Sequence, residues 1–326
     1  MTLLRLSPTA MSRCRFAVSQ LAETVGSLIA LHRPCTDPWL APWHACHQVG
    51  YRAWLEQDVV ASGLMPLVAA TKWMPDVVAL PPAGGMRTRL ADELVVVAAH
   101  SDEDVRSTIA EAVAASWKPQ DTGWLALDGL GPRVAAVIEE GWERFVAPDW
   151  PRRRAVIERD IMHRAGLLAA YGWKHAVENL TRLSTWVGDD AILFSHQDWP
   201  DRWITDDGLI FVPQTAGGGW WTCERPPQYA FVYPARGPAV RADPEADALS
   251  ALLGPGRARV VRELARPATS TQLAHALEVS LGTVSTHLAV LRDADMVVGA
   301  RVGRSVVYRL TDRGDRLVAL LEAEPS

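Results

Sequence analysis

Two helix-start signals separated by a tight turn dominate the C-terminal part of the chain. Thr269, with Gln272 three residues later, has the form of a capping box, in which each side chain satisfies a free amide at the start of a helix. After a turn at Glu278 and Val279, Ser280 is a natural N-cap for a second helix. Apolar residues then recur at i, i+4 and i+7: Val284, Leu288 and Leu291. This spacing fixes one face of the second helix to a core and leaves the other face free.

The free face of this second helix carries small polar residues near its N-terminal end, where a helix can enter a groove. These residues, with the N-cap, are Ser280, Gly282, Thr283, Ser285, Thr286 and His287. A hairpin is predicted next, with strands over 297–302 and 305–310 and Gly303 at its tip. Arg301 and Arg304 flank that tip. Alternate residues of the returning strand are expected to face inward: Val306, Tyr308 and Leu310.

Two short helices are predicted before this unit, over 247–253 and 256–265, and one after it, over 312–321. This element order is that of a winged helix, and the segment SLGTVSTHLAVLRDADMVVGARVGRSVVYRLT resembles the ArsR-type family of bacterial transcriptional regulators. The resemblance covers residues 245–326. Its most specific pieces are Ser280, Thr283-Val284-Ser285, His287-Leu288, Val290-Leu291-Arg292, Gly303-Arg304 and Val307-Tyr308-Arg309-Leu310. The last helix offers Leu317, Leu320 and Leu321 to a partner.

The resemblance implies a regulator that binds double-stranded operator DNA as a homodimer and represses by covering a promoter. The polar residues of the free face would contact bases, and Arg301 and Arg304 would contact phosphates or the minor groove. Two departures from the family matter. Glu278 stands where the family usually has glycine, and a left-handed backbone there costs about 1 kcal/mol. The free face also lacks Arg or Lys until Arg292, so Thr, Ser and His must share the base contacts.

Prolines and glycines interrupt the chain near residues 234–245, at Pro234, Gly237, Pro238 and Pro244. We therefore expect an N-terminal domain over 1–240 and a DNA-binding domain over 245–326. The net charge of −5 belongs to the first part, because residues 1–244 hold 23 basic and 28 acidic residues and residues 245–326 hold 10 of each. The second domain therefore carries no net negative charge that would oppose a polyanion.

Helices dominate the expected N-terminal domain, with apolar residues at three- and four-residue spacing. They are predicted over 19–31, 42–56, 101–117, 132–145 and 151–171. Four short strands, over 3–6, 191–194, 209–212 and 230–233, are expected to form a small antiparallel sheet. The fold class is thus α+β, mostly helical with a small sheet, followed by a winged helix. This first domain also resembles an uncharacterised domain that precedes such winged helices in regulators of high-GC bacteria, through RFAVSQLAETVGSL, PDWPRRRAVIERDI and VYPARG.

All 14 tryptophans precede residue 222, and several fall around the predicted strands. The candidates for a ligand site are Trp199, Trp203, Trp220 and Trp221. Large rigid rings with a single N–H donor suit the walls of a pocket for a hydrophobic or aromatic effector. Ordinary packing in the core or between domains is the competing interpretation.

A cluster of soft donors, His32, Cys35, His44, Cys46 and His47, is the strongest candidate for a metal site. Its spacing matches no structural zinc pattern, and the ArsR-type metal motifs are absent from the helices over 269–277 and 312–321, so we expect no metal and no cofactor.

The common signatures of hydrolases, metalloproteases and nucleotide-binding enzymes are also missing, so we expect no enzyme and no catalytic residue. Acidic residues such as Glu139, Glu140 and Glu143, or Asp160 with His163, are interpreted as a solvated helix face or as members of local salt bridges. The alternative is an enzyme or small-molecule-binding protein in which the winged helix serves only for dimerisation. No apolar run reaches the roughly 18 residues of a membrane span, and no secretory signal is visible, so we expect a cytoplasmic protein.

Overall fold

The computed structural model describes residues 2–35, 37–178, 180–181, 184–195, 200–217, 219–235 and 248–322. It divides into two compact units. The first contains residues 1–149 and 167–235, and the second contains residues 150–166 and 236–326. Most of the predicted junction near residues 234–245 lies outside the described residues, because the description stops at residue 235 and resumes at residue 248. The division places Trp150–Gly166 in the second unit, whereas the sequence put this segment in the first domain.

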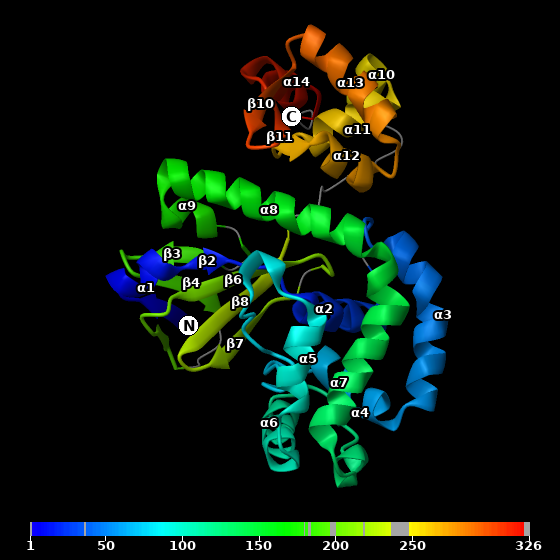
Figure 1. Cartoon of the computed structure of the whole chain (residues 1–326), viewed down its shortest axis with the longest axis vertical. Coiled ribbons are helices and arrows are strands. Elements are labelled where there is room, and N and C mark those ends of the chain that lie inside the picture. Colours follow the sequence, from blue (N-terminus) through cyan, green and yellow to red (C-terminus); the bar gives the residue numbers. More distant parts are fainter. Residues whose placement is uncertain are drawn as a thin grey trace. The chain divides into compact units, whose positions relative to one another are not determined.

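The first unit is built around two four-stranded sheets (Figure 1). One sheet has the order β3-β4-β1-β5, formed by Thr185–Val187, Ala191–Ser195, Thr2–Leu6 and Arg202–Ile204. The other has the order β2-β6-β8-β7, formed by Arg15–Phe16, Leu209–Gln214, Gln228–Pro234 and Trp221–Arg225.

Side-chain alternation on β6 and β8 separates two hydrophobic cores, because successive residues of a strand point to opposite faces. Leu209 and Phe211 of β6 pack with Leu4 of β1 and the other residues between the two sheets. Ile210 and Val212 belong instead to the larger core under the helices. The second sheet is therefore buried on both faces, which explains why every residue of β6 is buried.

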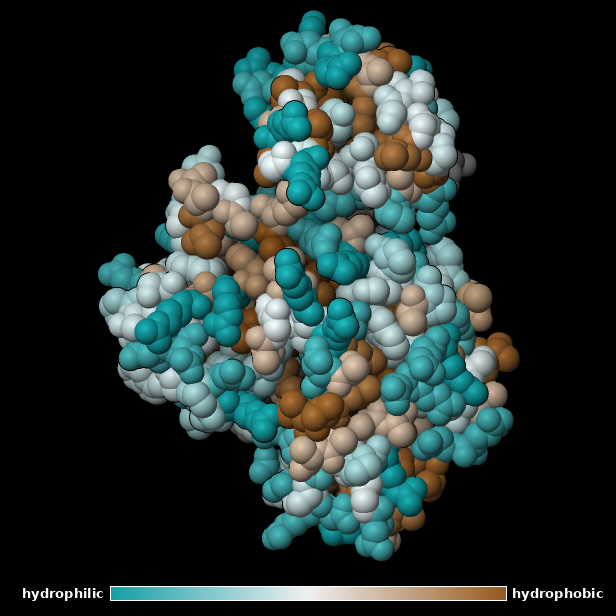
Figure 2. Space-filling view, viewed as in Figure 1, coloured by the Kyte–Doolittle hydropathy of each residue, from teal (hydrophilic) through white to brown (hydrophobic). Residues whose placement is uncertain are grey.

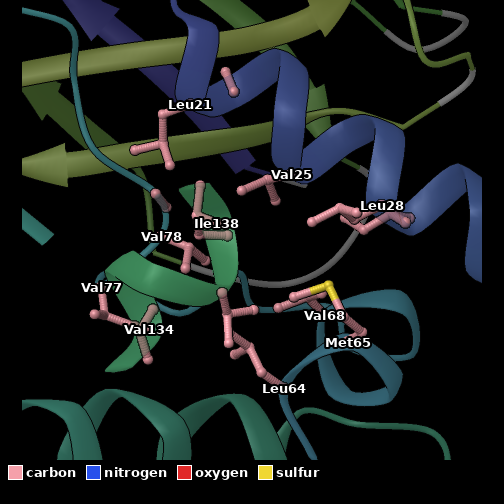
Figure 3. Packing of buried hydrophobic residues seen from close by; sticks show 14 of the residues in the cluster. Leu21, Val25, Leu28, Leu64, Met65, Val68, Val77, Val78, Val134 and Ile138 are labelled. Atoms are coloured by element: carbon pink, nitrogen blue, oxygen red, sulfur yellow. The ribbon is translucent and has the colours of Figure 1, made fainter. Parts of the chain in front are cut away.

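Helices form the other layer of the first unit. They are α1 (Pro8–Arg13), α2 (Gln20–His32), α3 (Ala41–Gln57), α4 (Val59–Ala69), α5 (Leu90–Ala98), α6 (Asp102–Ala114), α7 (Leu130–Gly141) and α9 (Trp173–Val177). A π-helical turn, Trp142–Val146, follows α7. Figure 3 shows Val25 of α2, Met65 of α4 and Ile138 of α7 meeting in one apolar space, which is the centre of the larger core.

The α+β fold class is confirmed, but the strands do not form one antiparallel sheet. The predicted strands over 3–6 and 191–194 pair in the first sheet, while those over 209–212 and 230–233 pair parallel to each other in the second. A parallel pair needs a crossover connection, and here the intervening strand β7 pairs antiparallel with β8. Three helices of the described part of this unit, α4, α5 and α9, were not predicted. Helix α4 is apolar on nearly all sides and contains Pro66, so it lacks the amphipathic period.

The second unit contains the predicted winged-helix order. Its elements are α10 (Ala248–Leu253), α11 (Pro255–Glu263), β9 (Ala268–Thr269), α12 (Ser270–Leu277), α13 (Leu281–Asp293), β10 (Val297–Val302), β11 (Ser305–Leu310) and α14 (Asp312–Glu322). The three strands form a sheet of order β10-β11-β9. Helix α8 (Trp150–Tyr171) contributes its residues 150–166 to this unit and its last turn to the first.

Figure 2 shows a face of the molecule covered largely by hydrophilic residues, with hydrophobic residues in smaller groups between them. Within the part of the chain that the structure describes, no helix has the length and hydropathy needed to cross a membrane.

Candidate DNA-binding surface and internal cavity

Local capping fixes the two helices of the helix-turn-helix as predicted. Thr269 Oγ1 accepts from Gln272 N at 3.2 Å, and Gln272 Oε1 accepts from Thr269 N at 2.8 Å, which completes the capping box of α12. Ser280 Oγ accepts from Thr283 N at 3.1 Å and so caps α13. The three apolar residues of α13, Val284, Leu288 and Leu291, are buried. Helix α13 is therefore held to the domain core by one face.

The turn between α12 and α13 has the expected left-handed residue. Glu278 has φ 57°, a left-handed backbone conformation that is strained for a residue with a Cβ atom. Two arginines support this turn. Arg259 Nη2 of α11 donates to Leu277 O at 2.8 Å, and Arg152 Nε of α8 lies 3.3 Å from Glu278 Oε1. The second contact places a cation against the exposed carboxylate of Glu278.

The free face of α13 is exposed where the sequence predicted it. The residues that solvent reaches there are Ser280, Gly282, Thr283, Ser285 and Thr286. Thr286 Oγ1 donates to Gly282 O at 3.0 Å, which leaves the lone pairs of its hydroxyl oxygen available as acceptors. His287 differs, because it is half-buried and packs on α11: a Cβ at Gly256 would lie 2.7 Å from His287 Nε2. A base contact by His287 remains a prediction that its packing partly opposes.

The hairpin after α13 forms the expected wing. Strands β10 and β11 pair from Val297 with Leu310 to Val302 with Ser305. Gly303 has φ 59° at the tip, and Arg301 and Arg304 beside it are exposed. The predicted inward alternation of β11 holds only near the base of the hairpin. Leu310 is buried and Tyr308 half-buried, but Val306 is 42% exposed because β11 there extends beyond the core toward the tip.

The first half of α8 is joined to the winged helix by buried ion pairs. Arg159 pairs with Glu263 of α11 and donates from Nη2 to Arg266 O at 3.2 Å. Asp160 Oδ1 lies 3.6 Å from Arg266 Nη1, and Asp160 Oδ2 accepts from Arg164 Nε at 2.9 Å. Of the two interpretations that the sequence left for Asp160, the structure bears out the local salt bridge, with Arg164 at i, i+4, and not the solvated face, since its exposed fraction is 0%.

Comparisons with known proteins match this domain. A family model described as a helix-turn-helix domain matches residues 252–299. The HTH-type transcriptional regulator NmtR of Mycobacterium tuberculosis is 43% identical over 68 residues, which are 21% of this chain and 57% of that protein. The HTH-type transcriptional repressor SmtB of the same organism is 38% identical over 81 residues, which are 24% of this chain and 60% of SmtB. The C-terminal domain is an ArsR-type winged helix-turn-helix.

The likeness is limited in extent, since the chain spans about six tenths of the length of these curated relatives. No solved structure gives a significant match to the chain. The match of the family model lies entirely within the C-terminal domain.

Two of the four candidate tryptophans of that unit line a cavity. Trp220 and Trp221 border a hollow of about 220 Å³ and an adjoining one of about 360 Å³. The other two candidates do not join them: Trp203 is 70% exposed and lies beside Arg5, and Trp199 is outside the described residues. The sequence missed Trp73 and Trp117, which complete the aromatic wall of the smaller hollow. They come from segments more than 100 residues before β7, so only tertiary packing brings them there.

Polar side chains of opposite charge also border this smaller cavity. Arg202 Nε donates to Glu224 Oε1 at 2.6 Å, and the Arg202 guanidinium lies 5.4 Å from the centre of the Trp73 ring. Asp76 is half-buried on the same wall. Burial, together with the charges of Glu111 and Glu224, raises the pKa of Asp76 to about 6.

The histidines near residues 32–47 contact different partners. His32 Nδ1 lies 3.3 Å from Tyr51 Oη, and His44 Nε2 lies 3.0 Å from Arg33 O. His47 packs against the rings of Trp43 and Phe145. Over the described ranges, no three His, Cys, Asp or Glu side chains come together in a way that could hold a metal ion. The absence of a metal in the working protein remains a prediction.

Proposed function

We propose that the chain is a homodimeric transcriptional repressor that binds operator DNA and is released by a small hydrophobic or aromatic effector. The observation that carries the DNA-binding part is the exposed, small polar face of α13 beside the two exposed wing arginines. In this proposal the effector binds in the cavity bordered by Trp220 and Trp221. The proposal rests on the ArsR-type domain and on the aromatic lining of that cavity.

The N-terminal turns of α13 enter the major groove in this proposal. Thr283, Ser285 and Thr286 present hydroxyls and methyl groups to base edges, and a threonine methyl suits the methyl group of thymine. Arg301 and Arg304 contact phosphates or the minor groove and supply most of the salt-dependent affinity. This division of roles gives specificity to α13 and affinity to the wing.

Two exposed leucines support the dimer. Leu252 of α10 is 61% exposed and Leu320 of α14 is 76% exposed, and these two helices pack together in the domain. Leu317 is half-buried, and the side chain of Leu321 lies outside the described part of the chain. Burying large apolar side chains against a second copy removes their contact with water. A two-fold dimer presents two recognition helices to half-sites about 34 to 36 Å apart.

In this proposal the effector binds in the cavity and is not converted chemically. An effector that binds the DNA-free form more tightly weakens DNA binding by the same factor by which DNA weakens effector binding. Helix α8 is the candidate element of coupling, because its first half is ion-paired to α11 and its last turn belongs to the first unit. Quantitative recovery of the bound molecule after incubation with the protein checks the absence of turnover.

The wing is tested by the salt dependence of DNA binding. The full chain is titrated into labelled DNA from upstream of its own gene at two salt concentrations, with fluorescence anisotropy as the readout. Arg304→Ala is expected to weaken binding to specific and random duplexes about equally and to lower the salt slope by about one phosphate contact. Arg87→Ala, at an exposed arginine of the first unit, is the matched control. Equal slopes for parent and Arg304→Ala contradict the role of the wing.

The recognition helix is tested by a change in preference. Thr283→Ala is expected to relax discrimination at one base position by about 1 to 3 kcal/mol if the contact is direct, while binding to random duplex stays nearly constant. Competition among duplexes with single base changes measures this. A variant with the same ranking of duplexes as the parent shows that α13 does not read bases through Thr283.

A further inference from the structure

We propose that the tryptophan-lined cavity selects an organic cation, a protonated amine or quaternary ammonium group carried on a small aromatic or apolar body. This inference rests on the proposed function only in naming the occupant as the effector of the regulator. The site itself is defined by its walls and charges. The five aromatic residues that border it are Trp73, Trp117, Phe194, Trp220 and Trp221.

The aromatic wall favours positive charge. The face of an indole ring attracts a cation within about 6 Å of its centre, and tryptophan does so most strongly among the aromatic side chains. The protein already uses two of these rings in this way. The Arg202 guanidinium lies 5.4 Å from the Trp73 ring centre, and the Arg33 guanidinium lies 5.9 Å from the Trp117 ring centre. Trp220 and Trp221 are left with no arginine over their rings among the contacts of the described residues.

The charges on the wall leave one carboxylate for a ligand. Glu224 is paired with Arg202 at 2.6 Å. Asp76 has no ion pair and no side-chain hydrogen bond within the described part of the chain, and its backbone N–H donates to Thr108 Oγ1 at 2.6 Å. Lys72 borders the same cavity but is solvent-exposed. A half-buried carboxylate without a partner is costly, and a bound cation removes that cost.

Other ligand classes fit this arrangement less well. An anion placed among the rings meets the negative ring faces together with Asp76 and Glu224. A neutral aromatic molecule fills the apolar space but leaves Asp76 desolvated and unpaired. Burial is the largest cause of the raised pKa of Asp76, so the ionised form of this carboxyl is poorly solvated here. The volume of about 220 Å³ suits a molecule of one substituted ring.

The test uses the full chain and three probes that share one ring: benzyltrimethylammonium, benzyl alcohol and phenylacetate. Binding is measured by titration calorimetry and by quenching of tryptophan emission, without DNA. We expect benzyltrimethylammonium to bind at least tenfold more tightly than benzyl alcohol and phenylacetate to bind most weakly. Tighter or equal binding of either of the other two probes overturns the proposal.

Two variants locate the binding. Asp76→Asn is expected to weaken benzyltrimethylammonium at least tenfold and to leave benzyl alcohol nearly unchanged. The matched control is Asp189→Asn, which removes the same charge from an exposed turn of the same unit. Because Asp76 is half-buried, Trp117→Leu is the second variant: Trp117 is 53% exposed, and its loss is expected to weaken the cation more than the alcohol. Cation binding that neither variant changes overturns the assignment to this cavity.

The two proposals fail separately. Cation binding that leaves the DNA titration unchanged supports the cavity and contradicts effector-controlled repression. If the protein binds operator DNA but does not bind the cation, the result contradicts the proposed cation site and does not contradict the proposed repressor.

Discussion

Asp76 is the residue whose protonation bears most directly on the proposed cavity. Its pKa is raised to about 6, first by burial and then by the charges of Glu111 and Glu224, while His100 opposes the shift. A cation needs the ionised carboxylate, so its affinity should be constant above about pH 7 and fall about tenfold per pH unit well below pH 6. Titration of benzyltrimethylammonium between pH 5 and 8 checks this. A flat profile for Asp76→Asn separates its titration from that of His100.

Glu93 predicts a pH dependence of stability in the same unit. Ser19 Oγ donates to Glu93 Oε1 at 2.5 Å and Leu21 N donates to Oε2 at 2.9 Å, yet burial raises the pKa of Glu93 from 4.5 to about 7. At pH values between 4.5 and about 7, Glu93 therefore keeps its proton in the folded state, whereas in the unfolded chain it has lost it. Its contribution, on the order of 3 kcal/mol, is present below about pH 4.5 and is lost as the pH rises to about 7.

The prediction for Glu93 is checked by measuring the urea concentration at the midpoint of unfolding between pH 5 and 8. The parent should lose stability over this range more steeply than Glu93→Gln. Glu103→Gln, which changes an exposed carboxyl on α6, should follow the parent. Parallel curves for parent and Glu93→Gln contradict the assigned shift.

At the scale of elements, α8 is held to the winged helix by the Arg159–Glu263 pair, whose side chains are 7% and 2% exposed. Removing one partner leaves the other charge buried and uncompensated, at a cost of about 3 to 5 kcal/mol. Arg159→Ala should therefore lower the free energy of unfolding of the second unit by roughly this amount. Arg154→Ala breaks the exposed pair with Glu158 and should change it by less than about 0.5 kcal/mol. Urea unfolding followed by circular dichroism compares them.

If both variants lower the free energy of unfolding by a similar small amount, the result contradicts the structural role of the Arg159–Glu263 pair. If Arg159→Ala folds and binds operator DNA as the parent does, it also tests α8 as the element of coupling. We then expect effector release of DNA to be weakened in Arg159→Ala and retained in Arg154→Ala.

The elements differ in how far the sequence could predict them. The winged helix was predictable because its signals are local: the capping box at Thr269, the N-cap at Ser280 and the glycine at the hairpin tip act within a few residues. Strand pairing in the first unit was not, because β6 chooses β8 through contacts made only in the folded protein. Helix α8 has basic residues that look solvated in sequence, and only tertiary packing buries Arg153 and Arg159.

The two candidate sites differ in the same way. The exposed face of α13 follows from helical periodicity alone, so Thr283 and Ser285 could be assigned to it. The cavity could be predicted only in part. Tryptophan abundance pointed to Trp220 and Trp221, but no local pattern connects them with Asp76 or Trp73.

At the scale of the whole molecule, the proposed dimer predicts a change in mass. Leu320→Glu places a charge on the exposed apolar surface of α14 and should convert the dimer to a monomer at micromolar concentration, because burying an unpaired charge is costly. Val49→Glu is the control, since Val49 is 79% exposed on α3 of the first unit. Light scattering after size-exclusion chromatography measures both. A parent that is already monomeric, or a Leu320→Glu variant that stays dimeric, contradicts this surface.

Sequence-specific DNA binding by the helix-turn-helix is the central claim, and selection of genomic fragments tests it most directly. Sheared DNA from the source organism is passed over the full chain and over a Thr283→Ala, Arg304→Ala double variant, and the retained fragments are sequenced. The account predicts that the parent enriches a few discrete sites with two inverted half-sites whose centres are one helical turn apart, or a multiple of it, and that the variant loses this enrichment. Retention by the parent without enrichment of any site, or the same enriched sites for both proteins, would contradict it.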